Sequence, residues 1–245
     1  MSEAASTRCP VLFEDRWLII INKPQGVLSH PNPRGKDERC AFEGRYDFDE
    51  KTFATPAGTI WLIHRLDQDT SGVLLAAKDE HAANACRLTF EQNEVRKLYL
   101  ALTLGGGLKS EGTWQDHLAV KHARNQVRTE VLRGPRPNAE SCFRVLEYSA
   151  AQRLTLLEIG LITGKTHQIR VQAAARHHPV VGDDIYGDFT ANRRLRKELG
   201  ARRLWLHAHR LEFKHPASHE VLKIAAPLAK ELQTVLTNAG MSTPA

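Results

Sequence analysis

The interpretation of this chain starts from one charged stretch, His64-Arg65-Leu66-Asp67-Gln68-Asp69-Thr70-Ser71-Gly72-Val73. It lies between two apolar segments, so its charged residues fall on a connection at the edge of a sheet, where functional groups often lie. A carboxylate at Asp67 can serve there as a nucleophile, a general base, a turn cap or an ion-pair partner. The residues alone leave these roles open.

Outward from this stretch, the apolar pattern predicts an α+β fold. Strands are expected at 17–22, 72–77, 97–104, 141–147, 154–162 and 206–214. Helices are expected at 79–95 with Asp79 as N-cap, from Thr163 or Thr166 to about residue 176, and from Pro227 onward. The alternating leucines of 97–104 predict a half-buried strand. The polar segment 31–58 is expected to form a long surface excursion with room for short structure. Runs of strands interrupted by a few helices favour one domain with a mainly antiparallel sheet.

Composition excludes several classes of protein. The chain has 245 residues, of which 42% are hydrophobic and 25% charged, as in ordinary globular proteins. It has no apolar run near the roughly 20 residues of a membrane span, and its N-terminus does not resemble a signal peptide. The four scattered cysteines show neither a disulfide framework nor zinc-ligand spacing. A reduced, cytoplasmic protein is therefore expected.

Positive charge is concentrated in two segments of a chain whose formal net charge is +6. The segment 119–137 holds five basic residues and one acid, and the segment 193–203 holds six basic residues and one acid. Such clusters are either solvated faces or surfaces that contact phosphates.

Two further segments carry candidate chemistry. A helix start is predicted at Gly164-Lys165-Thr166-His167-Gln168-Ile169-Arg170-Val171. Lys165, Arg170 and the first backbone N–H groups would favour an anion there. The alternative is an ordinary capped helix with a surface arginine. Tyr99 lies opposite the leucine row of its strand, either as a packed ring or as a surface on which a nucleobase stacks.

These three segments, in this order and together with His178-Pro179-Val180-Val181-Gly182-Asp183 and Tyr186-Gly187, resemble the RluA-type RNA pseudouridine synthases. Enzymes of that family isomerise uridine within RNA to pseudouridine. The resemblance implies the pseudouridine synthase fold, a mixed, mainly antiparallel central sheet flanked by helices and loops with a catalytic cleft. It implies a catalytic domain at 11–238, an extended or disordered segment at 1–10 and a flexible tail at 239–245, without the S4-like RNA-binding module of many relatives.

By the same resemblance, the catalytic aspartate is Asp67, the active-site tyrosine is Tyr99, and Arg170 is the basic residue that pairs with the aspartate. Arg65 is expected to fill the space left by a flipped base. The family commonly has His at the position of Gln172. The residues expected to contact RNA are Arg65, His64, Lys165, His167, Lys121, Arg124, Arg193, Arg194 and Arg196.

The predicted function is isomerisation of uridine in tRNA or rRNA by base flipping. The reaction needs no redox change and no group donor, so no cofactor is expected. RNA is the expected partner, with no membrane and no metal, and a monomer is the default. Two alternatives remain: a catalytically silent RNA-binding protein on the same scaffold, and a sugar hydrolase that uses Asp67 and Asp69.

Overall fold

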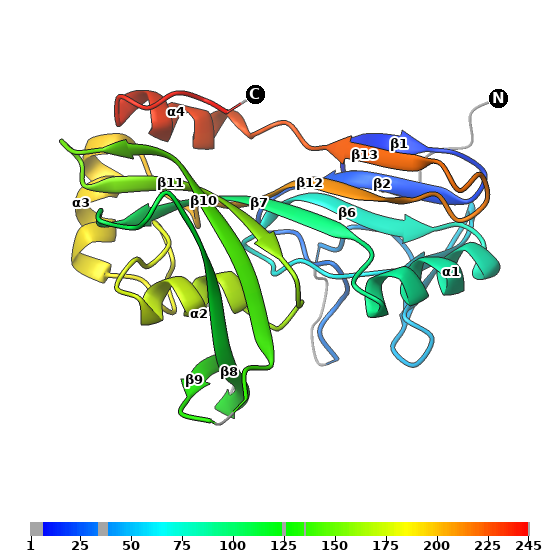
Figure 1. Cartoon of the computed structure of the whole chain (residues 1–245). Coiled ribbons are helices and arrows are strands. Elements are labelled where there is room, and N and C mark those ends of the chain that lie inside the picture. Colours follow the sequence, from blue (N-terminus) through cyan, green and yellow to red (C-terminus); the bar gives the residue numbers. More distant parts are fainter. Residues whose placement is uncertain (1–6, 34–38, 124–125, 135, 245) are drawn as a thin grey trace. The chain divides into compact units, whose positions relative to one another are not determined.

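The computed structural model describes residues 7–33, 39–123, 126–134 and 136–244, and these form two compact units. The first unit comprises the chain up to Arg96 together with Ala208–Pro227, and the second comprises Lys97–His207 and Leu228 onward. Figure 1 labels most of the helices and strands of both. The mixed α+β class agrees with the sequence-based expectation.

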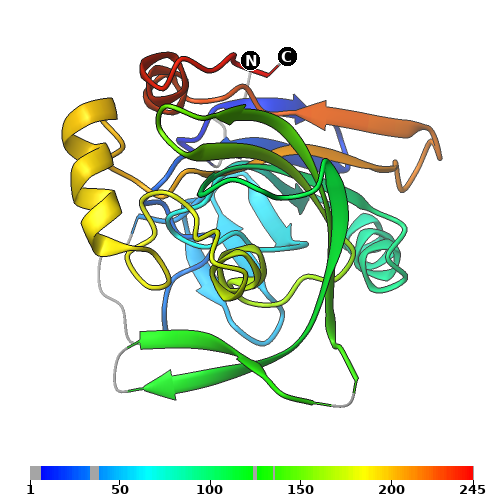
Figure 2. The same ribbon diagram turned by 60° about the vertical axis from the view of Figure 1, so that its left-hand side comes forward.

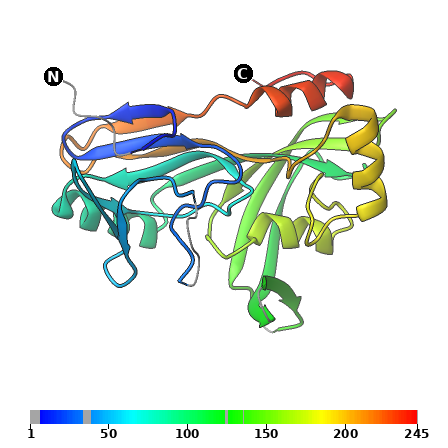
Figure 3. The same cartoon turned by 180° about the vertical axis from the view of Figure 1, so that it is seen from behind.

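The first unit is built on antiparallel strands in the order β1-β2-β6-β5-β4-β3. β12, most of which belongs to this unit, is a hydrogen-bonded neighbour of β6 in the same sheet and pairs antiparallel with β13. One helix, α1, packs beside β5 and β6 (Figure 3). The bounds are β1 Val11–Glu14, β2 Leu18–Lys23, β3 Arg45–Asp47, β4 Thr52–Thr55, β5 Gly58–Leu62, β6 Ser71–Ala77, α1 Glu80–Glu91, β12 Leu206–Lys214 and β13 Val221–Ala225.

The second unit is built on antiparallel strands in the order β7-β11-β10-β8-β9. The long strand β8 pairs first with β10 and then with β9, so that the β8–β9 hairpin extends away from the rest of this unit (Figures 1 and 2). The bounds are β7 Arg96–Leu104, β8 Glu111–Ala123, β9 Gln126–Leu132, β10 Ala139–Ser149, β11 Leu154–Leu161, α2 Gln168–Ala175, α3 Phe189–Leu199 and α4 Lys230–Asn238.

Each unit has its own apolar core. In the first, residues of β2 and β6 pack against α1 and β12 around Leu18, Leu75 and Phe213. In the second, β7 and β11 pack against α3 and α4 around Trp205 and Leu232. Trp205 is fully buried, and its indole N–H donates to the Leu232 carbonyl at 3.2 Å, which satisfies the ring's one polar group.

Several sequence expectations need correction. The strand β7 is buried on both faces, not half-buried, because Tyr99, Ala101 and Thr103 are covered as well as the leucines. The polar excursion 31–58 agrees with its expectation, because its described part holds only the short strands β3 and β4 and the first residue of β5. The last helix begins at Lys230, three residues beyond Pro227.

Neither threonine caps α2, which begins at Gln168 after the left-handed His167 (φ 56°). The side chain of Gln168 folds back instead, and its Oε1 accepts the Lys165 N–H at 3.0 Å. The Thr163 hydroxyl donates to the same oxygen at 2.9 Å, so Thr163 holds the Gln168 side chain in place ahead of the helix. The expected N-cap Asp79 is confirmed, because its carboxylate accepts the Ala82 N–H at 3.0 Å.

Candidate active site

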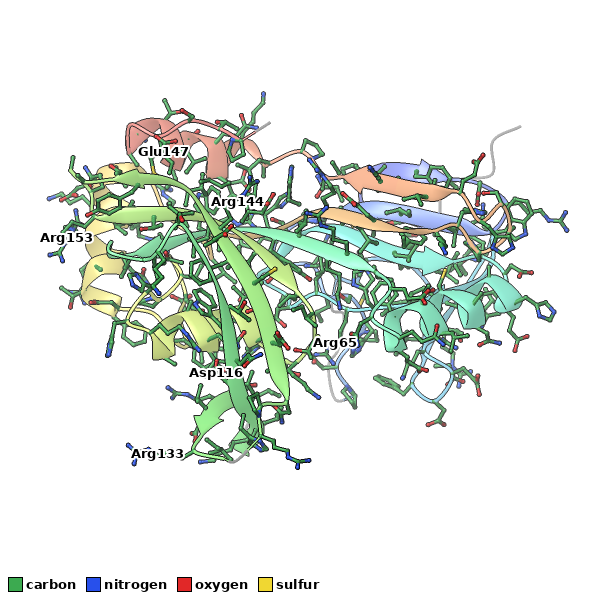
Figure 4. The ribbon with its side chains drawn as sticks, viewed as in Figure 1. Arg65, Asp116, Arg133, Arg144, Glu147 and Arg153 are labelled. Carbon is green, nitrogen blue, oxygen red and sulfur yellow. The ribbon has the colours of Figure 1, made fainter. Side chains whose placement is uncertain are left out.

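The Asp67 segment connects β5 to β6 in the first unit, as its place between apolar segments predicts. Leu66 and Thr70 are 5% and 2% exposed, and the Thr70 N–H donates to the Asp67 carbonyl at 3.1 Å. The side chain of Asp67 is half-buried between these anchors. Arg65, labelled in Figure 4, is exposed. The connection is therefore anchored in the core and presents charge at its surface.

A glycine fixes where this connection re-enters the sheet. Gly72 has φ +117°, a conformation that residues with a Cβ rarely adopt. A Cβ at this position would overlap the backbone of Ala208. Glycine is therefore required five residues after Asp67, so that β6 can lie against the neighbouring backbone.

A brace from residues 23–29 holds the backbone on both sides of Asp67. The Ser29 hydroxyl donates to the Leu66 carbonyl and accepts the Leu66 N–H, both at 2.9 Å. The fully buried Lys23 ammonium donates to the carbonyls of Gln68 (3.1 Å), Val27 (2.7 Å) and Pro24 (3.1 Å). Because a buried ammonium is costly unless it is hydrogen-bonded, these contacts explain how Lys23 is tolerated.

His64 is part of the same scaffold. Its Nε2 accepts the Leu75 N–H at 3.0 Å, and its ring stacks on Phe90 at a centroid distance of 5.2 Å. A nitrogen that accepts a hydrogen bond carries no proton, so this contact requires the imidazole to be neutral. His64 thus ties the connection to β6, while its predicted contact with RNA stays a prediction.

The second unit contains the other two predicted catalytic residues. Tyr99 lies on β7 opposite Ile159 of β11 and is 9% exposed. Arg170 lies on α2 and is 3% exposed, which excludes the alternative of a surface arginine. Asp67 belongs to the first unit and Arg170 to the second, so the pairing that the family resemblance implies stays a prediction.

Arg170 has a partner that the sequence did not reveal, because its Nε and Nη2 donate to the two oxygens of Asp183 at 2.7 and 2.8 Å. Asp183 is fully buried, and its Oδ1 also accepts the N–H groups of Ile185 and Tyr186. Burial raises the pKa of Asp183, but its bonds to Arg170, the Arg170 charge and the two backbone N–H groups outweigh burial and lower that pKa overall. The bidentate pair fixes both the position and the plane of the guanidinium.

Tyr186 links this ion pair to the β8–β9 hairpin. The Arg170 guanidinium lies 5.4 Å from the centroid of its ring, within cation–π range. Its hydroxyl accepts the Thr129 N–H of β9 at 2.7 Å and lies 2.9 Å from His167 Nδ1. Burial raises the pKa of Tyr186, so the hydroxyl stays protonated at neutral pH. His167 therefore supports this network at the start of α2.

Gln172, where the family commonly has His, is fully buried in a polar network. Its Nε2 donates to Asp116 Oδ2 at 2.8 Å, and its Oε1 accepts from the Ser141 hydroxyl at 2.8 Å. The same Asp116 oxygen accepts from Arg176 at 2.8 Å; Asp116 is labelled on β8 in Figure 4. These contacts hold α2 against β8 and β10.

The residues expected to contact RNA differ in their surroundings. Arg193, Arg194 and Arg196 are exposed on α3, whose N-cap is Asp188, and Lys165 is also exposed. Arg194 pairs with Glu198 at 2.7 Å, and Lys121 of β8 pairs with Glu130 of β9. Arg203, which the charge pattern grouped with the α3 arginines, is 8% exposed and pairs with Glu231 at 2.9 Å. Arg124 lies outside the described residues.

Within the described parts of the chain, no group of three histidine, cysteine or acidic side chains is arranged to hold a metal ion. The His178 ring uses Nδ1 for a contact of 2.8 Å with the Leu104 carbonyl oxygen. No described helix is long and apolar enough to cross a membrane.

Comparison with known proteins places the chain in a family. Residues 17–175 match the family of RNA pseudouridylate synthases. Ribosomal large subunit pseudouridine synthase C of Vibrio parahaemolyticus is 34% identical over 96% of this chain and 71% of its own length. Ribosomal large subunit pseudouridine synthase D of Xanthomonas campestris is 36% identical over 93% of this chain and 68% of its own length.

A solved structure agrees with this relationship. The human RNA pseudouridylate synthase domain containing 4 superposes with a TM-score of 0.72 and 26% identity, over 96% of this chain and 95% of its own. The chain therefore belongs to the RluA-type RNA pseudouridine synthases and is an isomerase.

Proposed function

We propose that this enzyme isomerises specific uridines of ribosomal RNA, with Asp67 as the catalytic carboxylate and with transfer RNA as the second substrate class to test. The observation that carries the proposal is the braced connection around Asp67. Lys23 and Ser29 hold its neighbours on both sides, which fixes the backbone that bears this carboxylate. The rRNA assignment is supported by the names of the two bacterial relatives, which are synthases of the large ribosomal subunit.

The reaction exchanges one bond to the sugar for another. The N1–C1′ bond of uridine breaks, the base turns, and C5 bonds to C1′; C5 then loses its proton and N1 gains one. Atoms and electrons balance without an oxidant, reductant or group donor. An ionised Asp67 acts either as a nucleophile at the sugar or as a base, and both roles require its charged form.

Arg170 is proposed to hold Asp67 in that charged form. Its bonds to Asp183 through Nε and Nη2 fix the plane of the guanidinium, which is the cation that the family resemblance assigns to the catalytic carboxylate. Tyr99 is proposed to stack on the uracil.

Access to the base requires that the nucleotide leave its stack, at a cost of a few kcal/mol. The exposed Arg65, two residues before Asp67, is proposed to take the place of the extruded base. Its planar guanidinium can stack on the neighbouring bases and pair with a phosphate.

The proposal is tested by giving the purified protein unmodified transcripts of large-subunit rRNA and, in parallel, tRNA transcripts. Pseudouridine positions are then mapped by chemical labelling and primer extension. We expect modification at one or a few rRNA positions. Modification of tRNA alone would move the substrate to that class, and an absence of product on both would contradict the proposal.

A surface patch on α3 is proposed to bind RNA phosphates. It consists of Arg193, Arg194 and Arg196. Replacing all three by Glu is expected to weaken RNA binding and to flatten its salt dependence. The slope of log K against log salt should change by about 0.7–0.9 for each phosphate that the variant no longer neutralises. The measurement is a titration of rRNA fragments at several salt concentrations.

The matched control for this patch is Lys214→Glu combined with Lys223→Glu, at exposed basic residues of β12 and β13. We expect a smaller change in slope than for the α3 variant. An unchanged slope in the α3 variant would show that these arginines are in contact with solvent and do not bind RNA phosphates.

A further inference from the structure

An aromatic cluster begins in the interior of the first unit and reaches its surface, within the polar excursion whose sequence pattern indicated no function. Tyr46 of β3 lies opposite Phe53 of β4, with ring centroids 4.7 Å apart. Phe53 in turn lies 5.7 Å from Phe42. Phe42 and Phe53 are 2% and 1% exposed, so the cluster has a buried base.

The outer rings of this cluster are held in fixed geometry. His30 stacks on Tyr46 at 5.2 Å with 12° between the planes, and Phe48 meets Tyr46 edge-on at 5.0 Å. His30 and Tyr46 are half-buried, whereas Phe48 is 46% exposed. We call His30, Tyr46 and Phe48 the aromatic platform. The platform therefore presents one exposed ring that is supported by two half-buried rings.

The backbone under the platform is restrained. Oδ1 of Asp47 accepts the N–H groups of Asp49 and Glu50 at 2.9 and 3.0 Å, which fixes the turn after β3. Arg87 of α1 donates to the Glu50 carbonyl at 3.0 Å and ties that turn to the helix. Rings that are already positioned lose little conformational entropy when a ligand stacks on them.

Positive charge adjoins the platform. Burial raises the pKa of Tyr46, while the charges of Arg65 and then Arg87 oppose that rise, so both guanidinium groups are close enough to act on this ring. The Asp47 charge acts in the other direction, but its carboxylate is occupied in capping the turn. Arg65 also connects the platform to the candidate site, because it lies two residues before Asp67.

We propose that the aromatic platform stacks an unpaired nucleobase of the RNA substrate, while Arg65 and Arg87 attract the adjoining phosphates. Exposed aromatic faces beside arginines match the two parts of a single-stranded nucleotide, its π-face and its charge. The identity of the ligand as RNA rests on the proposed function. The nucleotide concerned would be one next to the extruded uridine.

The test measures the affinity of the full chain for a labelled nine-nucleotide oligouridylate by fluorescence anisotropy. Phe48→Ala is expected to bind about 5- to 150-fold more weakly, equivalent to about 1–3 kcal/mol for one stacked base. Its salt slope should match the wild type, because the variant keeps every basic side chain. Phe48→Trp is expected to retain the affinity and to show quenching of the new indole on RNA binding.

Tyr148→Ala is the matched control, since Tyr148 is also an aromatic residue that is 46% exposed but lies on β10 of the second unit. Its affinity should equal that of the wild type. Unchanged binding in Phe48→Ala, or an equal loss in Tyr148→Ala, overturns the proposal. Thermal melting verifies that all variants are folded.

This assay requires no turnover, so failure of the platform and failure of the proposed function can be told apart. If no pseudouridine forms but oligonucleotide binding depends on Phe48, the platform stands and the proposed function fails. If pseudouridine forms and neither KM nor affinity changes in Phe48→Ala, the proposed function stands and the platform proposal fails.

Discussion

Asp67→Asn is expected to lower the rate of pseudouridine formation by at least about 10²- to 10⁴-fold, the range associated with loss of a general acid or base. Asn has nearly the same shape but cannot ionise, so it can neither accept a proton as a carboxylate does nor attack C1′. RNA affinity should change by less than about threefold, because the variant removes no positive charge. Single-turnover assays at saturating enzyme separate the rate from binding.

The control is Asp69→Asn, two residues further along the same connection. Asp69 is exposed, so its replacement should leave both the rate and the melting temperature close to wild-type values. The pair also tests the hydrolase alternative, which requires both carboxylates. A fully active Asp67→Asn enzyme would remove this residue from the mechanism.

Much of the fold could be predicted from local patterns. Continuous apolar runs correctly indicated β2 and β6, and the spacing of small apolar residues indicated α1. β7 shows the limit of such reasoning. Its alternation of leucines with Tyr99, Ala101 and Thr103 indicated one buried face, yet tertiary packing covers both faces. An alternating sequence pattern indicates which residues can be exposed to water, but it does not indicate which of them are exposed in the folded protein.

The prediction of where α2 starts was wrong for a different reason. Thr163 and Thr166 are good capping residues by type, but α2 begins only at Gln168, after the left-handed His167, and the Gln168 side chain accepts the Lys165 N–H ahead of the helix. Propensity ranks residue types and cannot rank two competing side chains in one turn.

The candidate site was predictable only in part. The motif around Asp67 located the connection, but the brace from Lys23 and Ser29 depends on contacts across 37 or more residues of sequence. Asp183 stood in the motif that carried the family resemblance, and nothing in the local pattern indicated that its partner is Arg170. Such a pair becomes visible only when burial shows that each charge needs the other.

Asp183→Asn is expected to lower the free energy of unfolding by about 3–5 kcal/mol, the cost of breaking a buried ion pair from one side. If the new amide oxygen takes the position of Oδ1, it still accepts hydrogen bonds from the same three N–H groups. The amide N–H₂ group then faces Arg170 Nε, so two hydrogen-bond donors oppose each other. Urea unfolding measures the loss. The adjacent Asp184→Asn is the control; its exposed side chain predicts a change below about 0.5 kcal/mol.

The pH dependence of this difference has a definite sign. Because the pKa of Asp183 in the folded protein lies below its ordinary value of 3.8, the ionised pair stabilises the fold fully above that value. The stabilisation is lost as the pH falls through the lower, folded-state pKa. The gap between wild type and Asp183→Asn should therefore be constant from about pH 5 to 8 and shrink below about pH 4.

A double variant separates the structural role of the pair from its catalytic role. Replacing Arg170 and Asp183 together by leucine removes both buried charges, and we expect it to recover much of the stability that Asp183→Asn loses. If Arg170 also holds Asp67, this stable protein should remain as inactive as Asp67→Asn while still binding RNA. Recovery of activity along with stability would instead confine Arg170 to supporting the fold. In that case the ionised state of Asp67 would have to depend on other groups.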